Sequence, residues 1–474
     1  MSVIENTIAA GPEAGFETLD DERAVDALEV EGVLPPWLQG TLLRNGPALF
    51  EDGERTVNHW FDGQAMLHRF TIADGRVGYA NRFLRTKAYA AVREGRLAFS
   101  EFATDPCRSI FKRAMTIFDP QVTDNAAVSI ARLGNEYHAM TEAPLSVLFD
   151  PQTLETLGYG EHVPGLFATA HPHSDPATGA LVNVATNMGP VNSYRFFVQE
   201  PGAKPRVLAK RAVAEPGYIH SFAMTDRYVA LAEFPFVVNS IEIPLSGRPF
   251  IENFRWKPER GTRIFVWDRH TGKKVGTYET EAGFAFHHVG AWEDGDRLVM
   301  EWCDHGTPDV VAALYLDRLR NGGGARPGPA RLRRVTIDLS SASVESERRA
   351  EHDLELPRIN EDAHYLRRYR YVYGFGRGAD SDFATADRLV KVDNESGEAV
   401  VWTEPGCFPG EPVFVAAPGA AAEDDGVLLS VVHDAAAGHS FLLVLDAQTM
   451  TERARAAAPH TIPQGFHGIF AREA

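Results

Sequence analysis

The sequence predicts an all-β chain, and three observations favour a β-propeller. Short apolar or alternating runs are separated by turn residues along most of the 474 residues, and long helical periodicity is scarce. One turn recurs at strand ends, with aspartate first and threonine or glycine completing it. Four histidines in similar small or apolar settings lie between positions 171 and 467. If they form one site, the fold must bring distant segments to a common axis, as the inner strands of propeller blades do.

Composition excludes several classes of protein. The net charge is −18, from 47 basic and 65 acidic residues, which argues against a nucleic-acid partner. The three cysteines are far apart and odd in number, so neither a disulfide framework nor a thiolate metal site is indicated. The first residues lack the basic and apolar regions of a signal peptide, and no apolar run reaches the ~20 residues that span a bilayer. We expect a cytoplasmic protein, with peripheral contact to a membrane as an option.

The chain divides simply. Residues 1–18 contain glycine, alanine and glutamate without periodicity, and we expect them to be flexible. No proline- or serine-rich linker splits the remainder, so residues 19–474 are expected to form a single propeller domain. An array of several β-sandwich domains is the alternative architecture.

The recurring turn follows four apolar runs. Its aspartates are Asp150, Asp268, Asp393 and Asp446. In each, the carboxylate is expected to accept hydrogen bonds from the backbone of the turn. The last two positions, 393 and 446, are separated by about the length of one propeller blade.

The stretch from Gly283 to Gly290 places His287 and His288 side by side in an apolar run. An acidic glycine turn and a second apolar run follow, which predicts a hairpin. Adjacent residues on a strand point to opposite faces, so only one of the two imidazoles can face a given interior. Taken alone, such a histidine is more often a satisfied core residue than a ligand.

The sequence around three other histidines favours a ligand role over a core role. Ala170-His171-Pro172-His173, Ile219-His220-Ser221-Phe222 and Gly465-Phe466-His467-Gly468 each abut a strand-like run. No local metal motif such as HExxH is present. A metal site here would therefore be assembled by the fold.

Together these blocks resemble the carotenoid cleavage oxygenase family, from about residue 40 to residue 470. The three settings above and Phe286-His287-His288 resemble its four iron-ligand motifs, in the family's order, and Phe61-Asp62-Gly63-Gln64 resembles an early motif. The likeness is closer to the animal branch, with β-carotene oxygenases and the retinal pigment epithelium isomerohydrolase. The blocks that start at Asn81, Asp105 and Val122 resemble that branch.

The resemblance implies a seven-bladed β-propeller with a helical or loop cap over its top face. It implies Fe(II) on the axis, bound by His171, His220, His287 and His467. In both ambiguous pairs it selects the first histidine, which leaves His173 and His288 as structural residues. It also implies three carboxylates behind the ligands, which map onto Glu142, Glu355 and Glu411. Neutral imidazoles suit Fe(II), and a carboxylate on the second ring nitrogen orients each ligand.

An apolar tunnel should hold one C=C bond beside the iron. Its candidate wall residues sit at or beside the motifs: Phe61, Phe102, Thr141, Phe286 and Phe466. Ordinary core packing is the alternative for each phenylalanine. Phe111, Met115 and Phe118, with Arg108 among the basic residues between and beside them, form a basic amphipathic segment suited to a membrane surface. Residues 234–238 are a second apolar loop candidate, and packing on the protein's own cap is the alternative for both.

The expected function is a non-haem Fe(II) dioxygenase that cleaves a polyene C=C bond with O2 into two aldehydes. The substrate implied is a carotenoid or apocarotenoid cut centrally to give retinal. One rival is the stilbene-cleaving branch, which has a lysine where this chain has Thr141. Another is the isomerohydrolase activity, whose membrane-attachment cysteine pair is reduced to Cys303 here. A non-catalytic polyene-binding propeller is the third, but no ligand is missing.

Overall fold

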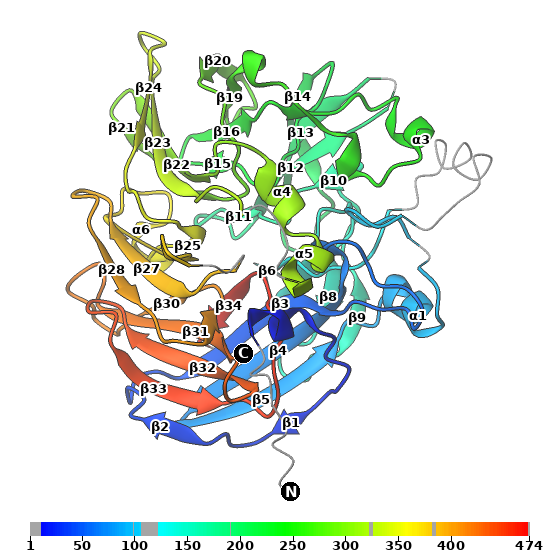
Figure 1. The fold of residues 1–474 in the computed structure, drawn as a ribbon. Coiled ribbons are helices and arrows are strands. Elements are labelled where there is room, and N and C mark those ends of the chain that lie inside the picture. Colours follow the sequence, from blue (N-terminus) through cyan, green and yellow to red (C-terminus); the bar gives the residue numbers. More distant parts are fainter. Residues whose placement is uncertain are drawn as a thin grey trace, which may run out of the picture.

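Seven sheets of four to six strands are arranged around a central axis in the computed structural model (Figure 1). The structure describes residues 11–97, 99–105, 122–189, 191–321, 326–381 and 385–472. Neighbouring strands within each sheet are antiparallel, and most of them follow one another in the chain, as hairpin-rich sequence patterns predict. The prediction of a seven-bladed β-propeller is therefore confirmed.

Each blade has one strand at the axis. Blade two contains β6 (Ser129–Leu133), β7 (Glu136–Met140), β8 (Val147–Phe149) and β9 (Thr156–Tyr159). Blade three contains β10 (Phe167–Ala168), β11 (His173–Ser174), β12 (Leu181–Asn187), β13 (Ser193–Gln199) and β14 (Arg206–Ala212). Blade four contains β15 (Ala223–Met224), β16 (Tyr228–Glu233), β19 (Thr262–Asp268) and β20 (Lys274–Thr280).

Blades five and six repeat the four-stranded pattern. Blade five contains β21 (His288–Asp294), β22 (Arg297–Asp304), β23 (Arg331–Asp338) and β24 (Val344–Arg348). Blade six contains β25 (Glu355–Arg358), β26 (Tyr371–Gly376), β27 (Arg388–Asp393) and β28 (Ala399–Trp402). The predicted hairpin after His287 is thus β21 and β22, and the strand begins only at His288.

The ring closes through both ends of the chain. Blade one contains β1 (Ala24–Val25), β3 (Gly40–Leu49), β4 (Gln64–Ala73), β5 (Arg76–Phe83) and, on the axis, β34 (Gly468–Ala471). Blade seven contains β29 (Cys407–Pro409), β30 (Val413–Ala416), β31 (Gly426–Asp434), β32 (His439–Asp446), β33 (Glu452–Ala457) and β2 (Val30–Gly32). β34 pairs with β3 and β2 pairs with β33, so the ends of the chain join the first and last blades at two places. This double closure holds the ligand-bearing inner strands at fixed positions.

The predicted aspartate turns form as expected. Asp150 Oδ1 accepts from the backbone N–H groups of Gln152 and Thr153, both at 2.8 Å. Asp268, Asp393 and Asp446 make the same pair of bonds to the residues two and three positions on. Each turn leads from the third strand of its blade to the fourth. These bonds lower the pKa of Asp268, where the backbone bond from Thr271 contributes most.

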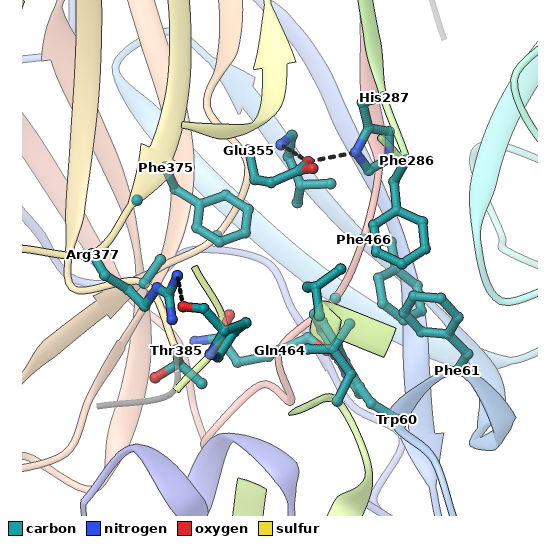
Figure 2. A pocket seen from close by; sticks show the side chains of 18 of the residues that line it. Trp60, Phe61, Phe286, His287, Glu355, Phe375, Arg377, Thr385, Gln464 and Phe466 are labelled. Atoms are coloured by element: carbon teal, nitrogen blue, oxygen red, sulfur yellow. Dashed lines mark hydrogen bonds and ion pairs between the residues drawn. The ribbon is translucent and has the colours of Figure 1, made fainter. Parts of the chain in front are cut away.

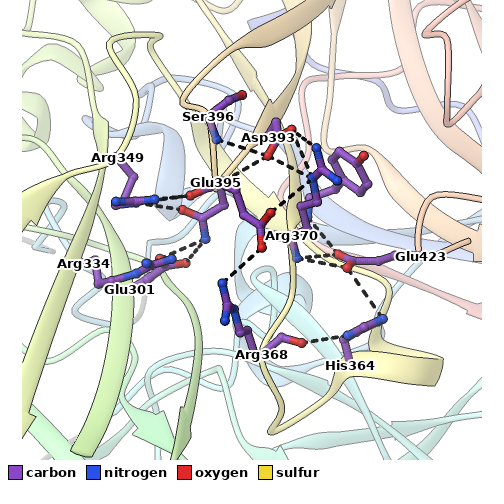
Figure 3. Close-up of polar contacts among 12 residues, drawn as sticks. Glu301, Arg334, Arg349, His364, Arg368, Arg370, Asp393, Glu395, Ser396 and Glu423 are labelled. Carbon is purple, nitrogen blue, oxygen red and sulfur yellow. Dashed lines mark hydrogen bonds and ion pairs between the residues drawn. The ribbon is translucent and has the colours of Figure 1, made fainter. Parts of the chain in front are cut away.

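Polar contacts tie neighbouring blades together at the turn after β27 (Figure 3). Glu301 of β22 is fully buried and accepts from Arg334 Nε at 2.7 Å. Its two carboxylate oxygens also accept from Asn394 Nδ2, at 2.9 and 2.8 Å. Glu423, in the loop between β30 and β31, accepts from the backbone N–H of Arg370 at 2.8 Å. Buried charges that are paired in this way set the register of adjacent blades, because an unpaired one would be costly.

Short helices lie before the first strand and in the connections between the strands. They are η1 (Pro12–Phe16), η2 (Trp60–Asp62), α1 (Lys87–Arg93), α3 (Ile243–Ser246), η3 (Ile251–Asn253), η4 (Pro258–Arg260), α4 (Asp309–Ala313), α5 (Leu316–Asn321) and α6 (Glu361–His364), with a two-stranded ribbon of β17 (Phe236–Val237) and β18 (Arg255–Trp256). α4 and α5 lie over the middle of the ring in Figure 1. In the part of the chain that is described, none of these helices has the length and apolarity to cross a membrane.

Two expectations change. Residues 234–238 are not an exposed loop, because Phe234 and Val238 are buried and Phe236 packs on Phe254 and Phe284. Ordered structure also begins before residue 19, since η1 is formed and Phe16 is 1% exposed against Trp60. The proposed membrane segment at 108–118 lies outside the described residues.

Candidate metal centre

Four imidazoles meet on the propeller axis. His171 lies between β10 and β11, and His220 lies three residues before the start of β15. His287 and His467 immediately precede β21 and β34. Each therefore enters the axis at the inner strand of a different blade. The Nε2 atom of His220 lies 3.1 Å from that of His171 and 3.3 Å from that of His287, and the Nε2 atoms of His287 and His467 are 3.1 Å apart. The four ligand atoms all lie within 4.8 Å of one another.

Carboxylates from the other three blades hold three of these rings. His220 Nδ1 donates to Glu142 at 2.7 Å, His287 Nδ1 to Glu355 at 2.5 Å, and His467 Nδ1 to Glu411 at 2.8 Å. Glu142 follows β7, Glu355 opens β25, and Glu411 lies between β29 and β30. Because the proton sits on Nδ1, each Nε2 presents a lone pair to the axis.

Three of the rings, those of His171, His287 and His467, are held in their neutral form. Burial lowers the pKa of His467 to about 4, although Glu411 acts in the opposite direction. Burial, together with the neighbouring imidazoles, also places the pKa of His171 well below its usual range. Burial lowers the pKa of His287 despite the opposing effect of Glu355. Neutral imidazoles that face one another with lone pairs cannot hydrogen-bond each other. The donor set therefore fits a divalent transition metal between the four nitrogens.

His173 and His288, the second histidines of the two pairs, use their nitrogens elsewhere. His173 contacts the Tyr365 hydroxyl with Nδ1 and the Phe222 carbonyl with Nε2, each at 3.0 Å. His288 Nδ1 lies 2.8 Å from the Ser221 hydroxyl. Neither belongs to the cluster of four among the described residues.

His305 is a site residue that the sequence reasoning missed. It follows β22, and its Nε2 donates to the second oxygen of Glu355 at 2.8 Å. Burial would raise the pKa of Glu355, but His287 and His305 outweigh it and hold the pKa well below its usual range. Figure 2 shows Glu355 reaching His287 from the cavity side. Glu355 is thus an anion with a donor on each oxygen.

Two arginines behind Glu411 were also missed. Arg44 Nη1 donates to Glu411 Oε2 at 2.6 Å, and Arg358 Nε donates to Oε1 at 2.9 Å. The Glu411 side chain is completely buried and also accepts from the backbone N–H of Gly468 at 2.8 Å. Burial would raise its pKa, but Arg358, His467 and Arg44 hold the pKa well below its usual range. In the sequence, Arg44 directly follows Leu42 and Leu43 in a strand-like run, and this position is the one signal that could have drawn attention to it.

A cavity opens beside the cluster. Phe61, Phe286 and Phe466 line it together with His220, His287 and His467, and Val310, Leu314 and Leu319 of the α4–α5 region cover it. Phe61 contacts both Phe286 and Phe466 edge-on, with ring centroids 5.9 and 5.1 Å apart. Their arrangement along one wall is visible in Figure 2. The cavity can accept an elongated apolar molecule next to the metal centre.

Two of the candidate wall residues lie elsewhere. Phe102 packs behind Phe61, with ring centroids 5.1 Å apart, and does not line the described part of the cavity. Thr141 precedes Glu142 and is also absent from that lining. Conversely, the wall includes a buried cation that sequence reasoning did not foresee, Arg377, paired with Asp353 at 2.8 Å.

Comparisons with known proteins agree with this geometry. The family model described as retinal pigment epithelial membrane protein matches residues 16–472. A carotenoid isomerooxygenase of Galleria mellonella is 34% identical, over 95% of this chain and 94% of its own. A beta,beta-carotene 15,15'-dioxygenase of Homo sapiens is 33% identical, over 96% of this chain and 93% of its own.

Solved structures are similar as well. A variant of the Synechocystis apocarotenoid oxygenase superposes with a TM-score of 0.85 and 29% identity, covering 98% of this chain and 99% of its own. A cobalt-substituted form of a Synechocystis protein reaches a TM-score of 0.87, with the same identity and coverage.

Proposed function

The chain belongs to the retinal pigment epithelial membrane protein family, and from this premise we propose that it is a carotenoid-cleaving dioxygenase. One observation carries the proposal: four imidazoles, three of them held by carboxylates, converge beside an aromatic cavity. The reaction adds both atoms of O2 across one C=C bond and yields two aldehydes, so it needs no further reductant. The relatives' names and the neighbouring apocarotenoid oxygenase support a polyene as substrate.

We propose Fe(II) as the metal, held by His171, His220, His287 and His467. Imidazole ligands suit iron, and four of them leave room for O2 or substrate on a metal that accepts six. Bound Fe(II) would supply the one-electron chemistry that lets O2 react with a polyene. Glu142, Glu355 and Glu411 fix the ring orientations and raise the basicity of the ligand nitrogens.

The cavity wall positions the substrate. Phe61, Phe286 and Phe466 offer aromatic faces and edges to a conjugated chain and exclude water from the metal centre. A polyene threaded along this wall would place one double bond beside the imidazoles of His287 and His467. We propose central cleavage, with retinal as a product, for a symmetric carotenoid or a long apocarotenal.

A stilbene-cleaving activity is the rival within the same fold. A phenol near the metal would need a cation to meet it, and Thr141 stands at the position where the resemblance places a lysine in that branch. The cavity lining contains no lysine among the described residues. Arg377 is a cation on the wall, but Asp353 already balances its charge.

We therefore expect the iron-loaded protein to cleave β-carotene or a long apocarotenal and to leave hydroxystilbene intact. Both substrates are incubated side by side, and the aldehydes are identified by mass spectrometry. Hydroxybenzaldehydes without polyene products would contradict the substrate class while leaving the fold and metal centre standing. Tight binding of a polyene without cleavage would instead favour a non-catalytic polyene-binding propeller.

Peripheral contact with a membrane would give access to such apolar substrates, and we propose it as a property of this chain. Around α3, Ile241 is 69% exposed and Leu245 is 72% exposed, four positions apart on one segment. Replacing both by glutamate should lower binding to liposomes and leave metal content unchanged, because exposed apolar side chains drive interfacial binding. Val400→Glu, at a residue 46% exposed on blade six, is the matched control. Equal liposome binding by the double variant and the parent would contradict the proposal.

A further inference from the structure

A polar group lies in the cavity wall away from the metal centre. Arg377, directly after β26, and Thr385 both line the cavity. Figure 2 shows them across the cavity from His287 and Phe286. The Arg377 side chain is only 8% exposed. Neither residue has a part in holding the metal, so their presence in a largely apolar cavity calls for another role.

Two N–H groups of the Arg377 guanidinium have no hydrogen-bond acceptor among the described residues. Of its five N–H groups, the one on Nε donates to Asp353 Oδ2 at 2.8 Å. Nη2 donates to the carbonyl oxygens of Pro327 and Gly328 at 3.1 and 3.2 Å. Nη1 is buried, and no residue in the described part of the chain accepts from it. Leaving a buried charged donor unpaired is costly, so Nη1 marks a place for an acceptor.

Thr385 supplies a second polar group that is buried and, among the residues described, unpaired. Its hydroxyl oxygen is buried and has no hydrogen-bond partner within the described ranges. Both groups can donate, and both line one cavity. Asp353 is itself 10% exposed and neutralises Arg377. The pair of donors therefore fits a neutral acceptor better than an anion, which would bring an uncompensated charge into a cavity with apolar walls.

We propose that Arg377 and Thr385 form an anchor, which binds the oxygen atom of a carbonyl or hydroxyl group at one end of the polyene. The enzyme would then select oxygen-ended apocarotenoids over hydrocarbon carotenes of equal length. The inference rests on the proposed function for one point, that the cavity holds a polyene. It does not depend on the chemistry at the metal. A hydrocarbon end would leave both donors buried without a partner, which is the physical basis of the selection.

Binding without turnover tests this separately from catalysis. Under nitrogen, quenching of tryptophan fluorescence gives the Kd of the iron-loaded protein for an apocarotenal, its hydrocarbon counterpart of equal length and the corresponding carboxylic acid. Trp60 lines the cavity and reports on the occupant. We expect the aldehyde to bind at least about 10-fold more tightly than the hydrocarbon, in line with hydrogen bonds to a charged donor. The acid should bind more weakly than the aldehyde.

Two variants locate the effect. Arg377→Leu and Thr385→Val should each weaken aldehyde binding and leave hydrocarbon binding unchanged or tighter. The ratio of the hydrocarbon Kd to the aldehyde Kd should therefore fall toward one. Thr385→Val keeps the side-chain shape and guards against a folding defect in Arg377→Leu. Arg388→Leu is the matched control, because Arg388 lies on the same blade, pairs with Asp387 and does not line the cavity. It should retain the preference of the parent.

The outcomes separate the two proposals. Equal binding of aldehyde and hydrocarbon by the parent, or an unchanged preference in both cavity variants, overturns the anchor. Preference for the aldehyde without any cleavage in air supports the anchor and contradicts the proposed function. Cleavage of both substrates at equal kcat/KM, with equal Kd, supports the function and overturns the anchor.

Discussion

Alanine at any one of His171, His220, His287 and His467 should abolish metal binding and polyene cleavage. Each histidine supplies one of four lone pairs that converge within 4.8 Å, and no other described residue belongs to that cluster. Removing a ring leaves a gap on one side of the metal. For the three rings held by carboxylates, it also removes one of the donors that the carboxylate accepts from. Metal content by elemental analysis and aldehyde yield after iron loading measure the effect.

The second histidines of the two pairs are the controls. His173→Ala and His288→Ala should retain the metal, because these rings bond to Tyr365, Phe222 and Ser221 rather than facing the axis. Normal metal content in His467→Ala, or loss confined to His173→Ala, would contradict the assignment of ligands.

Glu411→Gln should have the largest effect on stability among the three carboxylate variants. Its oxygens accept from His467, Arg44, Arg358 and the Gly468 backbone in a fully buried position. Glutamine removes the negative charge that compensates two guanidinium groups. It also places an amide N–H₂, itself a donor, where all neighbouring groups donate. We expect about 10–100-fold loss of metal affinity or activity. Because a buried ion pair is broken, the free energy of unfolding should fall by about 3–5 kcal/mol.

Glu142→Gln is the internal comparison. Glu142 accepts only from His220 and the Tyr218 hydroxyl among the described residues, and its side chain is 18% exposed. It should lose metal affinity or activity to the same degree, about 10–100-fold, with little change in stability. Glu355→Gln should resemble it in activity, with His305 also losing its anionic acceptor. Denaturant titration and metal affinity are measured for each, and wild-type activity in all three variants would contradict their role.

Much of the fold could be predicted because its signals are local. Turn aspartates such as Asp268 bond to residues two and three positions on, so spacing alone predicts the turn. The choice of His287 over His288 was harder. Strand periodicity allows one inward ring but does not say which, and the resemblance made the selection. The structure gives the reason: β21 begins at His288, and His287 lies in the loop that enters the axis.

The parts that could not be predicted depend on distant contacts. Arg44 and Glu411 are separated by 367 positions, and His305 and Glu355 by 50. Arg377 reads as a loop residue beside glycines, and only the closed blade shows that its guanidinium is buried against Asp353. The apolar run at 234–238 fits a membrane loop or a core equally well by composition. Its burial is decided by the aromatic neighbours that blade five contributes, including Trp302.

Oxygen labelling tests the central claim most directly. The anaerobically iron-loaded protein is given a long apocarotenal and then ¹⁸O₂, and the aldehydes are trapped at once to prevent exchange with water. If the four histidines make this chain a dioxygenase that cleaves a C=C bond, each of the two new carbonyl groups should carry one ¹⁸O atom. A new carbonyl oxygen derived from water, or an intact polyene despite a full complement of iron, would contradict the account.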